Sequence, residues 1–295
     1  MQQMPAESEG TSVTEETEGV RRAANGRPYI WLPDHSKEVQ YTRTSTFAKA
    51  LSDGDALSSW KLGTMVKGLM VEPGLLNIVL KPLAELEGDI DHPDLKDKIK
   101  SVVALSMDAG GANDAANWGT TLHHFADLID FTDEPLNRDM WDLSPELWDA
   151  LDAYVELTAD MKMLTGEQFV VQDDLKVAGS YDRTALWRDR VVVTDLKTGA
   201  VRMPDHAAQT AIYSRSKGYN KQTGERIEGP IDTVDQSVGL IVHLPRPGVK
   251  DSKGKQVEPS IIPVDIEAGW KCALLAEEVR QARKGKYALP MEEEK

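Results

Sequence analysis

Val191-Val192-Val193-Thr194-Asp195-Leu196-Lys197-Thr198-Gly199 joins a β-branched run to an acidic residue and a lysine. β-Branched residues favour strands, so residues 191–194 predict a strand that leads directly into Asp195. Successive side chains of a strand point to opposite faces, which places Asp195 and Lys197 on one face and Leu196 in the packing on the other. A carboxylate and an amine are therefore expected side by side at the end of this strand.

A second carboxylate lies thirteen residues earlier, in Gly179-Ser180-Tyr181-Asp182. We expect Asp182 to end a strand of approximately residues 176–183. The polar segment from Thr184 to Arg190 then predicts the turn that leads into the next strand. A hairpin of this kind would bring Asp182 beside Asp195.

Two carboxylates and an amine in this arrangement predict a metal-dependent nuclease centre. The carboxylates can hold one or two divalent cations, and the backbone carbonyl of Leu196 is a hard oxygen that can join them around Mg²⁺ or Mn²⁺. Lys197 could orient a water or neutralise the charge that develops on phosphorus. The alternative is a surface salt bridge, because an Asp-x-Lys triplet after an apolar strand is common by chance.

An upstream segment, Gly119-Thr120-Thr121-Leu122-His123-His124-Phe125, continues to Asp130 and has the pattern of a helix. Leu122, Phe125 and Ile129 recur at helical spacing, and His123 lies off that apolar stripe. A neutral imidazole at His123 could be a further metal ligand, one that favours Mn²⁺ over Mg²⁺. A lone helical histidine is otherwise structural or solvated.

A downstream helix is expected from Pro204 to Lys217, because proline suits the first turn and Gly218 can end the helix. Gln209 would lie near the metal and its water, and Tyr213 near a phosphate or base. The polar positions of this helix recur at spacings of three and four: His206, Gln209, Tyr213 and Lys217. This stripe predicts either a contact with a nucleic-acid strand or a solvated outer face.

In this order, Gly-Thr-x-x-His, Gly-x-x-Asp, Asp-x-Lys-Thr-Gly and Gln-x-x-x-Tyr resemble the RecB-type nuclease domain of the PD-(D/E)xK superfamily. That group includes nuclease domains of bacterial recombination helicases, CRISPR-associated exonucleases of the Cas-four type and stand-alone phage exonucleases. The resemblance implies an α/β fold, with a restriction-endonuclease-like core whose mixed central sheet is flanked by helices. It also implies the following roles: His123, Asp182 and Asp195 as metal ligands, Lys197 as a catalytic residue, Gln209 and Tyr213 as members of the motif helix, and Glu167 at a weaker acidic position.

The function implied by the resemblance is a metal-dependent DNA exonuclease that uses Mg²⁺ or Mn²⁺ to process DNA ends in recombination, repair or phage replication. A structure-selective endonuclease and a catalytically weak nucleic-acid-binding protein with a nuclease fold are the alternatives. The expected partner is DNA, with a single-strand annealing or recombination protein and self-assembly as further possibilities. Cys272 is the single cysteine, so the four-cysteine iron-sulfur cluster of many Cas-four-type enzymes cannot form. The chain also lacks a phosphate-binding loop of the helicase type, which favours a stand-alone nuclease.

The formal net charge of −15 opposes a DNA-binding role unless positive charge is gathered locally. Much of the acid lies at the ends, with five glutamates and no basic residue in the first 19 residues. Eight basic residues surround the motifs: Arg183, Arg188, Arg190, Lys197, Arg202, Arg215, Lys217 and Lys221. Each of these side chains could line a groove or belong to a solvated face.

The chain divides by composition into an acidic tail expected to be disordered (1–26), a helical N-terminal region packed on the core (27–109), the nuclease core (110–288) and an acidic C-terminal tail (289–295). In the helical region, Arg43, Trp60 and Lys61 could contact a DNA strand, but Trp60 is expected in the core. No apolar run is long enough to span a bilayer and no hydrophobic signal region is present, so we expect a cytoplasmic protein without a membrane partner.

Overall fold

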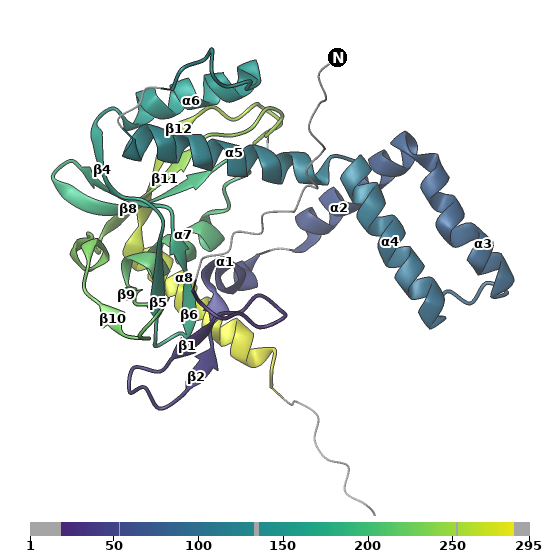
Figure 1. Ribbon diagram of the computed structural model, residues 1–295, viewed down its shortest axis with the longest axis horizontal. Helices are drawn as coiled ribbons and strands as arrows, with labels where there is room; N and C mark the ends of the chain where they lie inside the picture. Colours follow the sequence, from purple (N-terminus) through teal and green to yellow (C-terminus); the bar gives the residue numbers. More distant parts are fainter. Residues whose placement is uncertain (1–18, 53, 133–135, 252, 286–295) are drawn as a thin grey trace, which may run out of the picture.

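The computed structural model describes residues 19–52, 54–132, 136–251 and 253–285 (Figure 1). It is an α/β structure with two five-stranded sheets, each of which contains both parallel and antiparallel pairs. A separate two-stranded hairpin is formed by β1 (Tyr29–Trp31) and β2 (Glu38–Gln40). The predicted α/β class is therefore confirmed, but the expected single central sheet is replaced by two sheets.

The first sheet has the strand order β10-β9-β5-β6-β3. β3 runs parallel to β6, and the remaining neighbours are antiparallel. Its strands are β3 (Thr42–Arg43), β5 (Gln168–Gln172), β6 (Val177–Tyr181), β9 (Lys217–Tyr219) and β10 (Arg226–Ile227).

The second sheet has the strand order β12-β11-β8-β7-β4. β8 runs parallel to β11, with Asp195 opposite Ile241, and the other neighbours are antiparallel. Its strands are β4 (Met161–Thr165), β7 (Arg183–Trp187), β8 (Arg190–Lys197), β11 (Val238–His243) and β12 (Ser260–Asp265).

The segment between Asp182 and the second motif differs from the expected hairpin. Residues 184–187 belong to β7, and the reversal needs only Arg188 and Asp189, whose φ angles of 48° and 61° are typical of a tight hairpin turn. The prediction of a turn from Thr184 to Arg190 was therefore wrong. Asp182 lies where the chain leaves β6 in one sheet and enters β7 in the other.

Eight α-helices occur in the described residues. They are α1 (Thr44–Ala48), α2 (Gly54–Val71), α3 (Asn77–Glu85), α4 (Pro93–Ala109), α5 (Ala112–Phe131), α6 (Pro145–Thr158), α7 (Met203–Ser214) and α8 (Ile266–Ala282). The helix predicted from Pro204 ends at Ser214 rather than Lys217, because Lys217 starts β9.

Helices cover both faces of the second sheet, which places β8 in the middle of the fold. On one face, Leu196 packs with Leu122 of α5 and Leu151 of α6. On the other face, Ile241 packs with Ala211 of α7 and Ile266 of α8. The alternation predicted for β8 follows from this arrangement, since Leu196 belongs to the α5 and α6 side while Asp195 contacts Gln209 of α7.

The predicted helical N-terminal region has two parts in the structure. Residues 27–52 supply β1, β2, β3 and α1 to the sheets, whereas α2, α3 and α4 extend to one side of the molecule and meet the core at α5 (Figure 1). Trp60 of α2 is 42% exposed, so its expected place in the core was wrong. Of the predicted tails, residues 1–18 and 289–295 lie outside the described residues.

No single helix in the described ranges has the length and apolar composition to cross a membrane. The segments Leu57–Val71 and Pro73–Glu85 meet that criterion only as a pair, and they are bent by 105° relative to each other.

Two glycines of α2 give a matched test of how this helix packs. A Cβ on Gly68 would lie 1.7 Å from the backbone oxygen of Ser106 in α4, whereas a Cβ on Gly63 would meet nothing within 4 Å. We expect Gly68→Ala to lower the free energy of unfolding by about 1–3 kcal/mol or more, because α2 and α4 must separate. Gly63→Ala should raise it by about 0.5–1 kcal/mol through helix propensity. Urea denaturation followed by circular dichroism measures both, and equal effects would contradict the close packing.

Candidate metal centre

Asp182 and Asp195 reach the same site from different sheets. The backbone N–H of Leu196 in β8 donates a hydrogen bond to Oδ2 of Asp182 at 2.7 Å. Asp182 therefore lies against the residue that follows Asp195, although the two carboxylates come from β8 and from the junction of β6 and β7. The expected proximity is present, and it results from the crossing between two sheets rather than from a simple hairpin.

The Asp195 carboxylate is buried, with 1% of the residue exposed. Lys197 forms an ion pair with its Oδ2, and the Gln209 amide donates to its Oδ1 at 3.4 Å. The Lys197 ammonium is thus the direct partner of Oδ2. Burial raises the pKa of Asp195, and the positive charge of Lys197 offsets part of that increase.

Lys197 remains an ammonium group in this site. Burial lowers its pKa, but the negative charges of Asp195 and Asp182 act in the opposite direction and leave the pKa above its usual value. The side chain is 21% exposed, so the charge keeps limited access to solvent. A fixed positive charge therefore lies next to both carboxylates.

His123 of α5 is the fourth residue of the site, beside Asp182. Its Nε2 lies 3.2 Å from the carbonyl oxygen of Leu196, which can only accept, so a neutral ring carries its proton on Nε2. Nδ1 then presents a lone pair, and it lies 3.9 Å from Oδ2 of Asp182. A histidine whose second nitrogen donates to a backbone carbonyl has the tautomer and orientation typical of a metal ligand.

Gln209 and Tyr213 of α7 hold the Asp195 side of the site. The Gln209 amide donates to Asp195 and lies 3.5 Å from the Tyr213 hydroxyl, which it also contacts as a donor. Burial raises the pKa of Tyr213, and the charges of Asp195 and Asp182 raise it further, so the phenol stays protonated. Tyr213 is only 4% exposed, so the polar stripe predicted for this helix is not a solvated face at Gln209 and Tyr213.

Gly179 of β6 has a steric role in the same site. A Cβ at this position would lie 2.7 Å from Oγ1 of Thr44 and 3.3 Å from the Tyr213 hydroxyl. The Gly-x-x-Asp motif thus leaves room for α1 and α7 to approach the strand that carries Asp182. This packing reason cannot be read from the sequence, because Thr44 lies 135 positions earlier in the chain.

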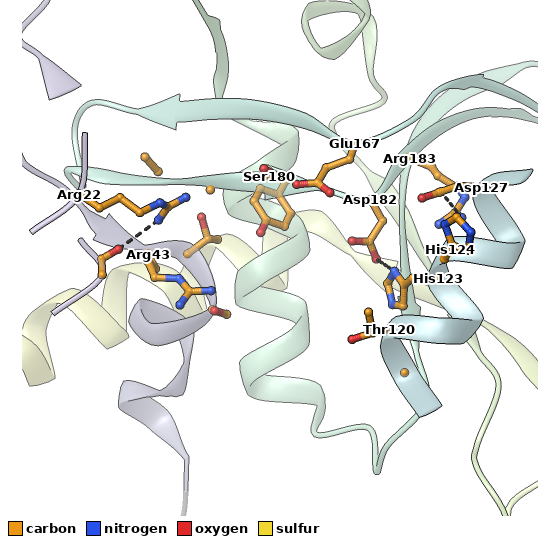
Figure 2. Close-up of a pocket in the computed structure, with 17 residues that line it drawn as sticks. Arg22, Arg43, Thr120, His123, His124, Asp127, Glu167, Ser180, Asp182 and Arg183 are labelled. Atoms are coloured by element: carbon orange, nitrogen blue, oxygen red, sulfur yellow. Dashed lines mark hydrogen bonds and ion pairs between the residues drawn. The ribbon is translucent and has the colours of Figure 1, made fainter. Parts of the chain in front are cut away.

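The site opens into a cleft of about 860 Å³ (Figure 2). Six residues singled out in the sequence line it: Arg43, His123, Glu167, Asp182, Arg183 and Tyr213. Asp195, Lys197 and Gln209 are not among the residues that line the cleft. Sequence reasoning missed Arg22, which it placed in the acidic tail, and it missed the cleft hydroxyls of Thr44, Ser45, Thr120 and Ser180. Glu167 lies on the cleft wall, and within the described residues it forms no hydrogen bond or ion pair with Asp182 or His123.

Arg183, the residue after Asp182, borders the cleft, but its side chain is buried and paired with carboxylates. Its guanidinium donates to Asp130 at 2.5 Å and to Asp127 at 2.6 Å, and 2% of the side chain is exposed. The Tyr154 hydroxyl donates to the same Asp130 at 2.5 Å. This network ties the start of β7 to α5 and α6, and so it sets the position of His123 relative to Asp182.

Several other basic residues near the motifs are also paired with carboxylates. Arg190 lies 3.5 Å from Asp235, and Arg215 and Lys217 form ion pairs with Glu267 and Asp232. Of the two alternatives left open for these residues, the exposed side chains of Arg190 and Lys217 agree with a solvated face, whereas Arg183 is buried and borders the cleft.

The residues of the site suit a hard divalent cation by their chemistry. Asp195 presents a buried carboxylate that is paired with Lys197, His123 presents an imidazole lone pair towards Asp182, and the Leu196 carbonyl has a second lone pair. In the described part of the chain, however, no three His, Cys, Asp or Glu side chains are close enough to hold an ion as they stand. Coordination would thus require small side-chain movements, including displacement of Lys197 from Asp195.

No protein-family model matches the chain, and no curated protein sequence matches it significantly.

The Arg183 network gives a test of stability. We expect Arg183→Met to lower the free energy of unfolding by about 3–5 kcal/mol, because Asp130 would be left as a buried charge without its partner. The double change Arg183→Met with Asp130→Asn should recover part of the loss. Arg190→Met, which removes an exposed ion pair, should cost at most about 1 kcal/mol. Urea denaturation compares the variants, and similar losses at Arg183 and Arg190 would contradict a structural role for this network.

His206 gives a test of pH dependence. Burial, together with the charges of Lys197 and Arg202, lowers its pKa from 6.5 to about 4. Between these values the unfolded chain binds a proton that the folded protein does not, so stability should increase as the pH rises from about 4 to 6.5. His206→Gln should remove this increase in the free energy of unfolding, which is at most about 3 kcal/mol. Urea denaturation across this pH range measures the free energy of unfolding, and His124→Gln, at an exposed histidine, is the control. A pH dependence of stability that is unchanged in His206→Gln would refute the lowered pKa of His206.

Proposed function

We propose that this chain is a metal-dependent DNA exonuclease with a RecB-type core of the PD-(D/E)xK superfamily. The observation that carries the proposal is the proximity of four groups. Asp182 and His123 line the cleft, and Asp195 and Lys197 flank Leu196, whose backbone N–H binds Asp182. The groups come from α5, from the junction of two sheets and from β8, so the fold brings His123 and Asp182 to the pair that Asp195 and Lys197 form within one strand. The order and identity of these residues agree with the motif resemblance.

The proposed cation is Mg²⁺ or Mn²⁺, held by Asp182, Asp195 and His123 with the carbonyl oxygen of Leu196. When bound, such an ion supplies Lewis-acid polarisation of the phosphodiester and lowers the pKa of a water. The imidazole ligand favours Mn²⁺, whereas the oxygen ligands suit either ion.

Lys197 supplies the positive charge of the proposed reaction. Its ammonium is protonated and lies within the cluster of carboxylates, where limited solvent access strengthens electrostatic interactions. With a cation held by Asp195, the Lys197 ammonium would be available to stabilise the negative charge that develops on the phosphate oxygens. Lys197 therefore has two partners in the proposal, Asp195 before metal binding and the substrate afterwards.

Gln209 and Tyr213 act as positioning residues in the proposal. The Gln209 amide contacts Asp195 and the Tyr213 hydroxyl together, which restricts how the carboxylate can rotate. The protonated Tyr213 hydroxyl also borders the cleft, where it can donate to a phosphate oxygen.

The decisive experiment measures cleavage of end-labelled linear DNA and closed circular DNA, single- and double-stranded, with Mn²⁺, Mg²⁺ or EDTA. We expect metal-dependent loss of linear DNA, and a fall in rate of at least about 10²–10³-fold in Lys197→Ala and Asp195→Asn. Lys162→Ala, which removes an exposed lysine from β4, should leave the rate unchanged.

Cleavage of closed circles would identify an endonuclease. A folded protein that binds Mn²⁺ but cuts no substrate would refute the nuclease proposal and favour a nucleic-acid-binding role.

A further inference from the structure

We propose that Arg27, Arg280 and Arg283 form a DNA-binding surface outside the cleft, the arginine surface, which continues the path of the bound strand past Arg43. Its partner is the phosphate backbone of the strand that the cleft holds. The inference rests on the proposed function for the identity of that strand. The arrangement of the arginines rests on the packing of α8 and of the N-terminal segment against β3.

Arg43 connects the arginine surface to the cleft. It lines the cleft at the end away from His123 and Asp182 (Figure 2). β3 pairs in parallel with β6, and Arg43 lies opposite Ala178, four residues before Asp182. Since a strand rises about 3.3 Å per residue, Arg43 lies about 13 Å from the candidate metal ligand along the strand direction.

Arg280 holds the carboxyl end of α8 beside β3. Its Nη2 donates to Oγ1 of Thr42 at 2.8 Å, directly before Arg43. Its guanidinium carbon lies 5.0 Å from the centre of the Phe47 ring in α1, and its Nε lies 3.8 Å from a carboxylate oxygen of Glu277. The side chain is mostly buried, so Arg280 fixes the geometry of the arginine surface.

Arg283 and Arg27 reach Arg280 from the helix and from the N-terminal segment. Arg283 caps α8 three residues after Arg280, so the two side chains share one face of the helix. Arg27 precedes Pro28, whose carbonyl oxygen accepts a hydrogen bond from the N–H of Tyr41 at 2.9 Å. Tyr41 leads directly into β3. The three arginines therefore come together around the start of this strand.

The positive charges of the arginine surface repel one another. Burial lowers the pKa of Arg280, Glu277 opposes this effect, and the charges of Arg27 and Arg283 lower the pKa further. Within the described residues, Arg27, Arg43 and Arg283 form no ion pair, whereas Arg280 pairs with Glu277. An anion bound across the surface would reduce this repulsion.

A DNA strand matches a row of guanidinium groups that leads away from a cleft. Phosphates of one strand follow each other about every 3.4 Å along the helix axis, and the planar fork of arginine binds their oxygens. A strand held at Asp182 would pass Arg43 about four phosphates away and then reach the arginine surface. A row of this length favours a polyanion over a single small anion. Backbone contacts of this kind position a strand without reading its bases.

The test measures DNA binding without catalysis. Fluorescence anisotropy would be recorded in EDTA with fluorescein-labelled single strands, for wild type and for Arg27→Gln/Arg283→Gln. The variant leaves Arg280 in place, so the contacts that hold α8 are kept, and circular dichroism verifies the fold. The matched control is Lys98→Gln/Lys162→Gln, which removes two positive charges from exposed positions on α4 and β4.

We expect Arg27→Gln/Arg283→Gln to bind a strand of about 12 nucleotides about 10–100-fold more weakly than wild type. The slope of log affinity against log salt should become shallower by about 0.7 for each phosphate that the variant no longer neutralises. Arg27→Lys/Arg283→Lys should keep the wild-type slope, because both charges remain. A decrease no larger than that of the control variant would overturn the proposal.

The length of the strand tests whether the arginine surface continues the cleft. Lengthening the strand from about 4 to about 12 nucleotides should raise the affinity of wild type, and this gain should be smaller in Arg27→Gln/Arg283→Gln. Equal weakening of the short and the long strand would overturn the proposed path.

The outcome is separable from that of the nuclease proposal. Binding that depends on Arg27 and Arg283 in a protein that cuts nothing would support the arginine surface and refute the nuclease. Metal-dependent cleavage together with binding that is unchanged in Arg27→Gln/Arg283→Gln would support the nuclease and overturn the arginine surface.

Discussion

The buried carboxylate of Asp195 is the constraint on which the arrangement of the site depends. A charge in the interior is unfavourable unless opposite charge and hydrogen bonds compensate it. Here Lys197 of the same strand supplies the charge, and Gln209 of α7, which packs on β8, supplies one hydrogen bond. Binding of a cation at Asp195 would therefore exchange the Lys197 ammonium for another positive charge.

Paired charges also connect the site to the helix that carries His123. Arg183 follows Asp182 directly and is buried against Asp127 and Asp130, so the strand that begins beside the site is tied to the helix that carries His123. A break in this network would disturb the site without touching any proposed ligand. Positioning of the imidazole and stability of the fold are thus coupled through one buried arginine.

The charged residues near the site are distributed unevenly. Several basic residues near the motifs form ion pairs with neighbouring carboxylates, which offset their charge. Arg22 and Arg43 line the cleft from the N-terminal segment and from β3, so part of its lining comes from regions outside the motifs. Net charge is therefore a poor guide to the local potential at this site.

The spacing of apolar and polar residues along the chain was sufficient to predict the strand before Asp195, the shared face of Asp195 and Lys197, and the helix of His123. Side chains on one face recur every two residues in a strand and about every 3.6 residues in a helix, so the sequence alone shows these patterns. The division into two sheets, the burial of Arg183, the exposure of Trp60 and the presence of Arg22 in the cleft were not predictable in this way. Each depends on which distant segments pair, such as β3 with β6, and pairing energies arise from contacts between residues far apart in the chain.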